Sequence, residues 1–199
     1  MTSSLDVSRE TNDLLSRYVD LVAKWNPKIN LVSKLSLDEV WVRHISDSVQ
    51  LFPLANRTGN WLDLGSGGGF PGIVVAIMDK QLNNRFSVTL IESDTRKCAF
   101  LRTAVRELNL SVEVVNDRIE NIAPQKASVI SARALTDLNG LIAFSQPHLQ
   151  PGGICLFPKG QSWYEEVETA RKNWKFIYEA VASATDPDAA IIKMEHIQS

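Results

Sequence analysis

The sequence predicts an α/β protein in which a mostly parallel, doubly wound sheet follows an N-terminal helical segment. From Asn60 onward, short apolar runs alternate with amphipathic stretches, which is typical of strands and helices in a parallel sheet. The chain has 199 residues, of which 44% are hydrophobic and 22% charged, so it can bury a core as one compact unit. We divide it into a helical extension, residues 1–59, and a sheet domain, residues 60–199.

Two helices are predicted in the extension, because apolar residues recur there at helical spacing. The first ends at Asn26-Pro27, since proline disfavours helix in the residue before it. The second runs from about Leu37 to Phe52 and is closed by Pro53. The apolar face of the first helix carries Leu14, Leu15, Tyr18, Leu21, Val22 and Trp25.

The remainder of the chain predicts seven strands and four helices. A turn signal, Pro151-Gly152-Gly153, precedes the fifth strand. The predicted strands span residues 61–64, 87–91, 112–115, 128–130, 154–157, 176–181 and 189–194. The predicted helices span residues 72–78, 95–108, 138–144 and 163–172.

Composition and charge exclude several classes of protein. No apolar run approaches the roughly 18 residues of a membrane span, and residues 1–10 are polar and lack the apolar segment typical of a secretory signal. Cys98 and Cys155 have no Cys or His partner at metal-ligand spacing, so we expect reduced thiols in a cytoplasmic protein and no metal site. The net charge of -2 argues against binding to nucleic acid by bulk electrostatics, but it does not exclude a local basic face.

A glycine-rich loop runs from Asp63 to Gly72, between the first strand and the helix that follows it. Gly65 and Gly67 permit a tight turn and a close approach of the backbone to a ligand. Dinucleotide-binding enzymes carry a similar loop for a pyrophosphate, so the loop alone leaves the cofactor open.

Acidic residues at three successive strand ends favour S-adenosylmethionine as the cofactor over a dinucleotide. Asp63 precedes the first glycine, where it suits a cationic amino group and repels a pyrophosphate. Glu92 ends the second strand, where a carboxylate accepts hydrogen bonds from both ribose hydroxyls. Asn116-Asp117 follows the third strand and is placed to meet the adenine edge. A glycine turn with unrelated surface carboxylates is the structural alternative.

The residues after the fourth strand indicate the nucleophile. No Asn/Asp-Pro-Pro-aromatic tetrapeptide, the usual cradle of an exocyclic amine, is present, and neither cysteine is set for attack on a pyrimidine. Instead the strand leads into Ser131-Ala132-Arg133-Ala134. An arginine suits a target that is already nucleophilic, such as a purine N7, which needs no general base. Arg133 is equally suited to orient the carboxylate of the cofactor.

Several motifs together resemble the ribosomal RNA small-subunit methyltransferase G family, also called glucose-inhibited division protein B. The combination of Arg-His-x-x-Asp-Ser with Gly-Phe-Pro-Gly-Ile is specific. The matching segments are Lys24-Trp25-Asn26, Asn30-Leu31-Val32-Ser33, Arg43-His44-Ile45-Ser46-Asp47-Ser48, Gly65-Ser66-Gly67-Gly68-Gly69-Phe70-Pro71-Gly72-Ile73, Ser131-Ala132-Arg133-Ala134 and Lys159-Gly160-Gln161.

The resemblance implies a Rossmann-like, seven-stranded class I S-adenosylmethionine-dependent methyltransferase fold. It also implies methylation of guanine N7 in 16S ribosomal RNA of the small subunit, without metal. Together, the residues and the resemblance give cofactor contacts at Asp63, Gly65, Ser66, Gly67, Gly69, Phe70, Glu92, Ile119, Glu120 and Arg133. The expected catalytic residues are Arg133, His44 and Lys159, and the expected RNA contacts are Arg43, His44 and Lys159.

Two features leave alternatives open. The family usually carries a basic residue before its last strand, whereas this chain has Asp186-Pro187-Asp188-Ala189-Ala190. This departure implies either a weaker RNA contact on that edge or a contact supplied from elsewhere. His44, with Asp47 one turn later, suits either a functional role or docking of the helical segment onto the sheet.

The acidic pI near 5.9 leads us to expect a preformed ribosomal particle as the substrate. Separately from the pI, we expect a monomer, although no motif in the sequence specifies the oligomeric state. The alternatives are a small-molecule or protein methyltransferase and a non-catalytic ribosome-assembly module. The modified nucleotide itself does not follow from the sequence.

Overall fold

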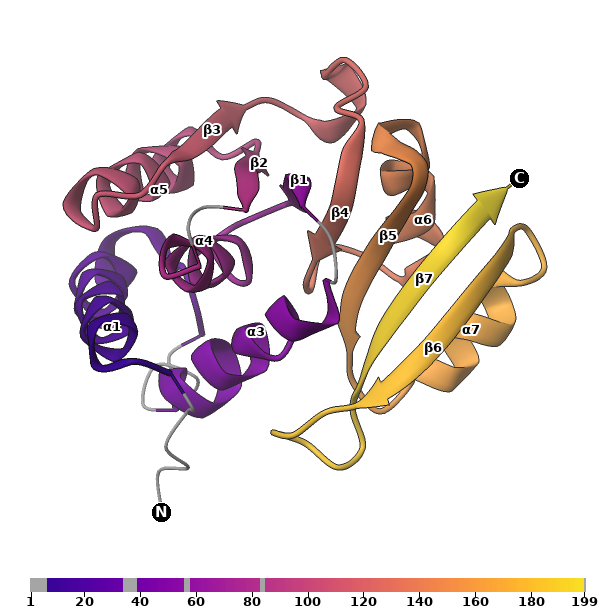
Figure 1. Cartoon of the computed structure of the whole chain (residues 1–199), viewed down its shortest axis with the longest axis horizontal. Coiled ribbons are helices and arrows are strands. Elements are labelled where there is room, and N and C mark those ends of the chain that lie inside the picture. The colour runs from indigo at the N-terminus through magenta and orange to yellow at the C-terminus, as the bar shows by residue number, and fades with distance from the viewer. Residues whose placement is uncertain (1–6, 34–38, 56–57, 83–84, 199) are drawn as a thin grey trace.

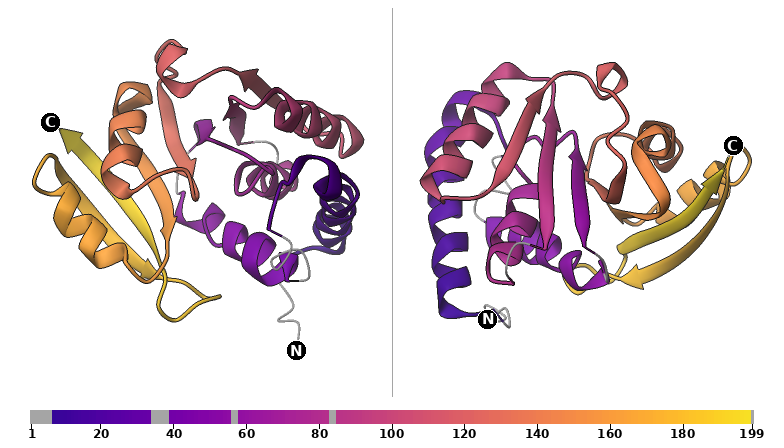
Figure 2. Two further views of the ribbon diagram at one scale, coloured as in Figure 1. Left: turned by 180° about the vertical axis from the view of Figure 1, so that it is seen from behind. Right: turned by 45° about the horizontal axis from the view of Figure 1, so that its top comes forward.

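Seven strands form a single sheet with helices on both of its faces (Figures 1 and 2). The computed structural model describes residues 7–33, 39–55, 58–82 and 85–198. The strands lie in the order β3-β2-β1-β4-β5-β7-β6, and β7 is antiparallel to both of its neighbours. The strands are β1 (Gly59–Leu64), β2 (Phe86–Glu92), β3 (Val112–Asn116), β4 (Ala127–Ala132), β5 (Leu149–Lys159), β6 (Lys175–Ala182) and β7 (Ala190–Gln198).

The helices divide between the two faces of the sheet, and each face has its own apolar core. Trp61 of β1 contributes to the core under α1, α4 and α5, whereas Leu62 and Leu64 contribute to the core under α6 and α7. This follows from strand geometry, because successive side chains point to opposite faces. The α-helices are α1 (Arg9–Ile29), α3 (Asp47–Val49), α4 (Gly72–Lys80), α5 (Thr95–Glu107), α6 (Leu138–Ser145) and α7 (Trp163–Ala170). None of the helices in the described ranges is long and apolar enough to cross a membrane.

The first helix continues past the predicted stop at Asn26-Pro27. It ends at Ile29, with Pro27 in its last turn, and Asn30 caps it in the left-handed region at φ 51°. The side chain of Asn26 accepts a hydrogen bond from the backbone N–H of Val32 at 2.9 Å. Proline costs a helix one hydrogen bond. Here, packing of the buried face of α1 against α4 and α5 outweighs that cost.

The second predicted helix is irregular where the structure describes it; the predicted start at Leu37 lies outside the described residues. A π-helical turn, η1 (Trp41–Ser46), precedes α3, and a 3-10 turn, η2 (Phe52–Leu54), follows. Turns of π-helix are rare in proteins, and those that do occur are often found at functional sites. The wider turn contains Arg43 and His44, both predicted site residues.

The turn signal Pro151-Gly152-Gly153 lies inside β5, so the prediction of a turn before the strand is wrong. The strand begins at Leu149, and Gly152 adopts φ 72° within it. The register to β4 shifts between Ala127 and Val129, which is the irregularity of a β-bulge. Glycine provides the positive φ that such an irregularity needs. The other predicted strands are confirmed, and β7 lies between β5 and β6.

Candidate cofactor and substrate sites

The glycine loop turns the chain sharply at the carboxyl end of β1. Gly65 and Gly67 have φ values of 63° and 55°, in the left-handed region that favours glycine. A Cβ at Gly65 would lie 2.7 Å from Cδ1 of Leu135, closer than real carbon contacts allow. Tyr18 of α1 donates its hydroxyl hydrogen to the carbonyl of Gly68 and is fully buried. Tyr18 therefore holds the loop from the side of α1.

A cavity of about 500 Å³ lies above this loop, at the carboxyl ends of β1, β2 and β4. Its size is in the usual range for pockets that bind small molecules. Ligands of open α/β sheets bind at this edge. The lining residues are Leu31, Val32, His44, Gly65, Ser66, Gly67, Gly68, Phe70, Ile91, Glu92, Ser93, Lys97, Asp117, Arg118, Ile119, Glu120, Arg133, Ala134, Leu135 and Phe144.

Glu92 joins the end of β2 to the glycine loop. Its Oε2 accepts a hydrogen bond from the backbone N–H of Gly67 at 2.8 Å, and its Oε1 accepts one from the backbone N–H of Asp94 at 2.8 Å. Each carboxylate oxygen has two acceptor sites, so both oxygens retain capacity for a ligand's hydroxyl groups. Only 7% of the residue's surface is exposed, which gives those acceptors a fixed direction.

The loop after β3 forms the far wall of the cavity. Ile119 and Glu120 belong to the 3-10 turn η3 (Ile119–Asn121). Asp117 accepts hydrogen bonds from the side chain of Asn121 at 2.9 Å and from the backbone N–H of Arg118 at 2.7 Å. These bonds lower the pKa of the Asp117 carboxyl. The turn is thereby held in a conformation that presents Ile119 to the cavity.

Asp63 lies beneath the loop and is not among the residues that line the cavity. Its Oδ1 accepts a hydrogen bond from the hydroxyl of Ser131 at 2.7 Å, and the residue is completely buried. Burial raises the pKa of the Asp63 carboxyl to about 6, although Ser131, Ser66, the backbone amide of Gly72 and the charge of Arg133 oppose the rise. Any effect of Asp63 on a ligand in the cavity is therefore transmitted through the loop and not by direct contact.

Arg133 is the centre of a polar cluster that joins β4 to η1 and α3. Its guanidinium donates to the backbone carbonyl of Arg43 at 2.8 Å, to Asp47 Oδ2 at 3.1 Å and to His44 Nδ1. It also lies 5.7 Å from the centre of the Phe70 ring. A guanidinium held by this many acceptors has one defined position.

His44 lies between Arg133 and Phe70. Its ring stacks on Phe70 with the ring centres 4.9 Å apart. Burial, together with the charges of Arg133 and Arg43, lowers the pKa of His44 to about 4. The ring is thus neutral near pH 7, with Nδ1 accepting from Arg133 and the hydrogen on Nε2. Nε2 is buried without a hydrogen-bond partner in the described part of the chain.

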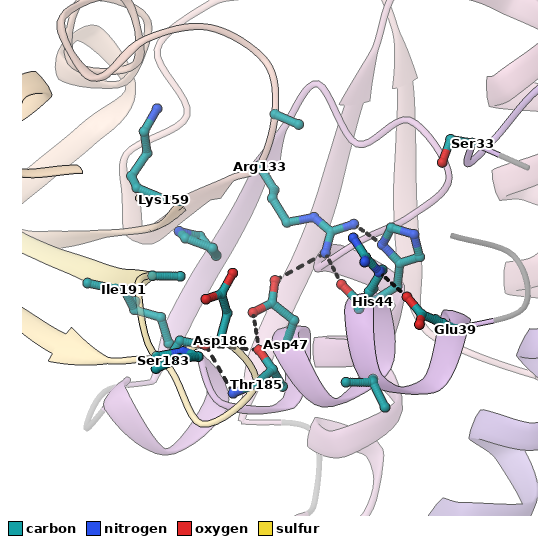
Figure 3. Close-up of a pocket in the computed structure, with 18 of the residues that line it drawn as sticks. Ser33, Glu39, His44, Asp47, Arg133, Lys159, Ser183, Thr185, Asp186 and Ile191 are labelled. Carbon is teal, nitrogen blue, oxygen red and sulfur yellow. Dashed lines mark hydrogen bonds and ion pairs between the residues drawn. The ribbon is translucent and has the colours of Figure 1, made fainter. Parts of the chain in front are cut away.

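A second cavity, of about 830 Å³, opens on the other side of Arg133 (Figure 3). Three residues, His44, Arg133 and Ala134, line both cavities and form a shared wall. Ala134 has φ 52°, which costs a non-glycine residue about 1–2 kcal/mol. Such strain concentrates at functional sites. The other lining residues are Ser33, Glu39, Val42, Arg43, Asp47, Pro158, Lys159, Gly160, Glu166, Ser183, Thr185, Asp186, Pro187, Ala189, Ala190 and Ile191.

The cationic side chains of this second cavity are paired with carboxylates. Arg43 pairs with Glu39, and Lys159 Nζ lies 2.6 Å from Glu166 Oε2. Lys159 also donates to the carbonyl of Thr136 at 3.2 Å. With Arg133 and Asp47, these pairs place three cations among four carboxylates, since Asp186 also lines the cavity. A cavity of this charge suits a neutral base better than a phosphate.

The structure brings most of the predicted site residues to these two cavities. Asp63 and Gly69 lie outside both linings, and Gly69 is packed against Ile73 and Tyr18. The sequence analysis did not select Lys97, Arg118, Leu135, Phe144 or Thr185, which line one cavity or the other. Lys97 lies in α5 and Phe144 in α6, whereas Arg118, Leu135 and Thr185 lie in loops. Their places at the cavities depend on how these elements and loops pack together, which no local motif specifies. No group of His, Cys, Asp and Glu in the described ranges is suited to hold a metal ion.

Comparison with known proteins agrees with this geometry. A family model described as rRNA small subunit methyltransferase G matches residues 11–191. A protein of Cereibacter sphaeroides named "Ribosomal RNA small subunit methyltransferase G" is 54% identical over 196 residues, which cover 97% of this chain and 94% of the relative. A protein of Ruegeria pomeroyi with the same name is 50% identical over 192 residues, which cover 96% of this chain and 94% of the relative.

Two solved structures share the fold. A SAM dependent methyltransferase from Aquifex aeolicus superimposes with a TM-score of 0.60 at 13% identity, covering 81% of this chain and 94% of that one. A mutant of MtNAS in complex with S-adenosylmethionine gives a TM-score of 0.61 at 11% identity, covering 93% of this chain and 75% of that one. The predicted seven-stranded methyltransferase fold is confirmed. The match of the family model over most of the chain, with relatives near 50% identity, shows that the chain belongs to the rRNA small subunit methyltransferase G family.

Proposed function

We propose that this protein transfers a methyl group from S-adenosylmethionine to N7 of a guanine in 16S ribosomal RNA of the small ribosomal subunit. The observation that carries the proposal is the wall shared by the two cavities, formed by His44, Arg133 and Ala134. A donor in the smaller cavity and a base in the larger one would meet there. The names of the relatives, at about 50% identity over nearly the whole chain, support ribosomal RNA as the substrate.

The residues of the smaller cavity fit the cofactor. Glu92 offers carboxylate acceptors for ribose hydroxyls, and Ile119 offers an apolar surface for a purine ring. A Cβ at Gly65 would clash with the side chain of Leu135, another residue of the cavity lining. When bound, the cofactor supplies an electrophilic methyl group on a sulfonium. The proposed cofactor contacts remain those expected from the sequence, with Asp63 acting through the loop.

The larger cavity suits a nucleophile that becomes positively charged. Guanine N7 has a lone pair and no hydrogen, so its methylation needs alignment more than a general base. The methylated ring carries a positive charge, which the excess of one carboxylate among the charged residues of the cavity would stabilise. Arg133 and His44 hold the shared wall in place, and Lys159 is the third proposed catalytic residue.

The RNA would be bound at the mouth of the larger cavity. Arg43 leaves 64% of its side chain exposed there, so its guanidinium can exchange Glu39 for an RNA phosphate. The overall charge of -2 leaves little bulk attraction to RNA. We therefore propose a preformed ribosomal particle as the substrate of a monomeric enzyme, acting in the cytoplasm where small subunits reside.

The proposal is tested by supplying labelled S-adenosylmethionine with either small ribosomal subunits or naked 16S RNA. The methylated nucleoside is then identified by digestion and mass spectrometry. N7-methylguanosine, formed faster in the particle, is the expected result. Label at another atom or base would overturn the assignment of N7. No label in either RNA, with the cofactor bound, would favour a small-molecule or protein substrate or a non-catalytic assembly module.

A further inference from the structure

A continuous chain of buried hydrogen bonds lies beneath the glycine loop. The indole Nε1 of Trp61 donates to the hydroxyl of Ser131 at 2.9 Å, and this hydroxyl donates to Asp63 Oδ1 at 2.7 Å. Trp61, Ser131 and Asp63 are completely buried. An indole can only donate and a carboxylate can only accept, so the direction of the chain is fixed. Ser131 has one hydrogen, and the chain commits it to Asp63.

This chain of hydrogen bonds connects the two loops that follow β1 and β4 and line the proposed cofactor cavity. Asp63 and Ser131 are paired in register in neighbouring parallel strands, one residue before the end of β1 and β4. The glycine loop follows β1, and Arg133 follows β4. A hydrogen bond between the two side chains therefore fixes the distance between the two loops at the point where each leaves the sheet.

The second oxygen of Asp63 faces the start of α4. Oδ2 has no hydrogen bond of regular geometry to any described residue, and a Cβ added at Gly72 would lie 2.7 Å from it. The positive end of a helix favours a negative charge at this place. The charged and titratable groups that act on Asp63 are Arg133, which favours the carboxylate, and the buried phenol of Tyr18, whose own pKa Asp63 raises.

We propose that Ser131 is a positioning residue for cofactor binding, which keeps the Asp63 carboxylate charged and fixed beneath the glycine loop. A fixed negative charge there attracts the cationic amino group of a bound cofactor and balances the N-terminal end of α4. Burial alone would favour the neutral acid, and the hydrogen bond from Ser131 is the largest opposing contribution to the pKa of Asp63. Trp61 orients Ser131 by occupying its acceptor side. The inference rests on the proposed cofactor site and is independent of the RNA substrate.

The test is binding of S-adenosylhomocysteine by calorimetry from pH 5 to 8, for the wild type, Ser131→Ala and Ser128→Ala. Ser128 is a matched control, because it is on the same strand, is 1% exposed and donates to the backbone carbonyl of Asn60 at 2.9 Å. We expect Ser131→Ala to weaken binding about tenfold at pH 7, the typical value of a hydrogen bond to a charged group. The midpoint pH at which this variant loses affinity on acidification should be higher than that of the wild type by roughly one pH unit. Ser128→Ala should keep the wild-type pH midpoint.

Equal pH midpoints for Ser131→Ala and Ser128→Ala would overturn the proposal, whatever their stabilities. Asp63→Asn provides a second measurement that does not depend on the folding of the serine variant. Its weaker binding should be flat from pH 5 to 8, because the titrating group is gone. If it keeps the acidic loss of affinity, another group titrates and the proposal is wrong. If no RNA is methylated but S-adenosylhomocysteine binding shows the expected pH dependence, only the proposed function is overturned.

Discussion

Arg133 and Asp47, 86 positions apart in the sequence, form an ion pair of 3.1 Å in the wall between the two cavities. The other carboxylate oxygen of Asp47 accepts a hydrogen bond from the hydroxyl of Thr185 at 3.2 Å. Asp47 thereby connects the end of β4 with the loop between β6 and β7. Together, the ion pair and the hydrogen bond from Thr185 join three separate segments of the chain at the larger cavity.

Asp47→Asn should destabilise the fold and slow RNA methylation, because it leaves the charge of Arg133 with only neutral acceptors. The two side chains are 17% and 19% exposed, so solvent screens the pair only partly. We expect a loss of about 1–3 kcal/mol in the free energy of unfolding, measured in urea. Glu168→Gln is the control, since the Arg171–Glu168 pair is about half exposed and its loss should cost under about 0.5 kcal/mol. Equal losses in both variants would contradict the role of the partly buried Arg133–Asp47 pair.

Gly65→Val should abolish cofactor binding. Valine at φ 63° is strained, and its Cβ would lie 2.7 Å from Leu135, so the loop or the Leu135 side chain, both part of the cavity lining, must shift. Calorimetry with S-adenosylhomocysteine measures the effect. Gly160→Val serves as the control, because no atom lies within 4 Å of a Cβ added at Gly160. Retained affinity in Gly65→Val would show that the cofactor does not bind above this loop.

Lys159→Ala should leave cofactor binding unchanged and lower kcat/KM for the ribosomal substrate by about tenfold or more. Lys159 lines the larger cavity and not the smaller one, so its loss is expected to act on the RNA side. Single-turnover methylation of small subunits measures the effect. Glu166→Gln is the companion variant, because it releases Lys159 from its ion pair without removing it. Intact methylation in Lys159→Ala would place the RNA face elsewhere.

Asp63→Asn should raise the stability of the protein without cofactor at neutral pH. The folded pKa of about 6 exceeds the ordinary value of 3.8, so the folded state holds the proton more tightly than the unfolded state. The associated stability is present below about pH 4 and is lost as pH rises through about 6. Above that pH, the buried charge costs on the order of 3 kcal/mol. Urea unfolding at pH 8 and pH 4 should show a gain for the variant at pH 8 alone. An equal effect at both pH values would contradict the shifted pKa.

The sequence predicted the regular part of the fold because that part is encoded locally. Alternation of apolar runs and helical periodicity located all seven strands, and the glycine loop identified the end of β1 where the cofactor cavity lies. The carboxylate of Glu92 was also predicted to face that cavity. The division of the chain between residues 59 and 60 stays a prediction, as do the roles assigned to the site residues.

Only the tertiary structure decided how distant segments meet. Helix packing overrode the local stop at Pro27, and strand pairing placed a glycine turn signal inside β5 as a bulge. Pairing between Arg133 and Asp47, like the burial of Asp63 under its own loop, depends on which strands become neighbours. Local sequence specifies backbone preference and the face of each side chain. Contacts between residues far apart in the chain depend on the packing of whole elements, which no local pattern contains.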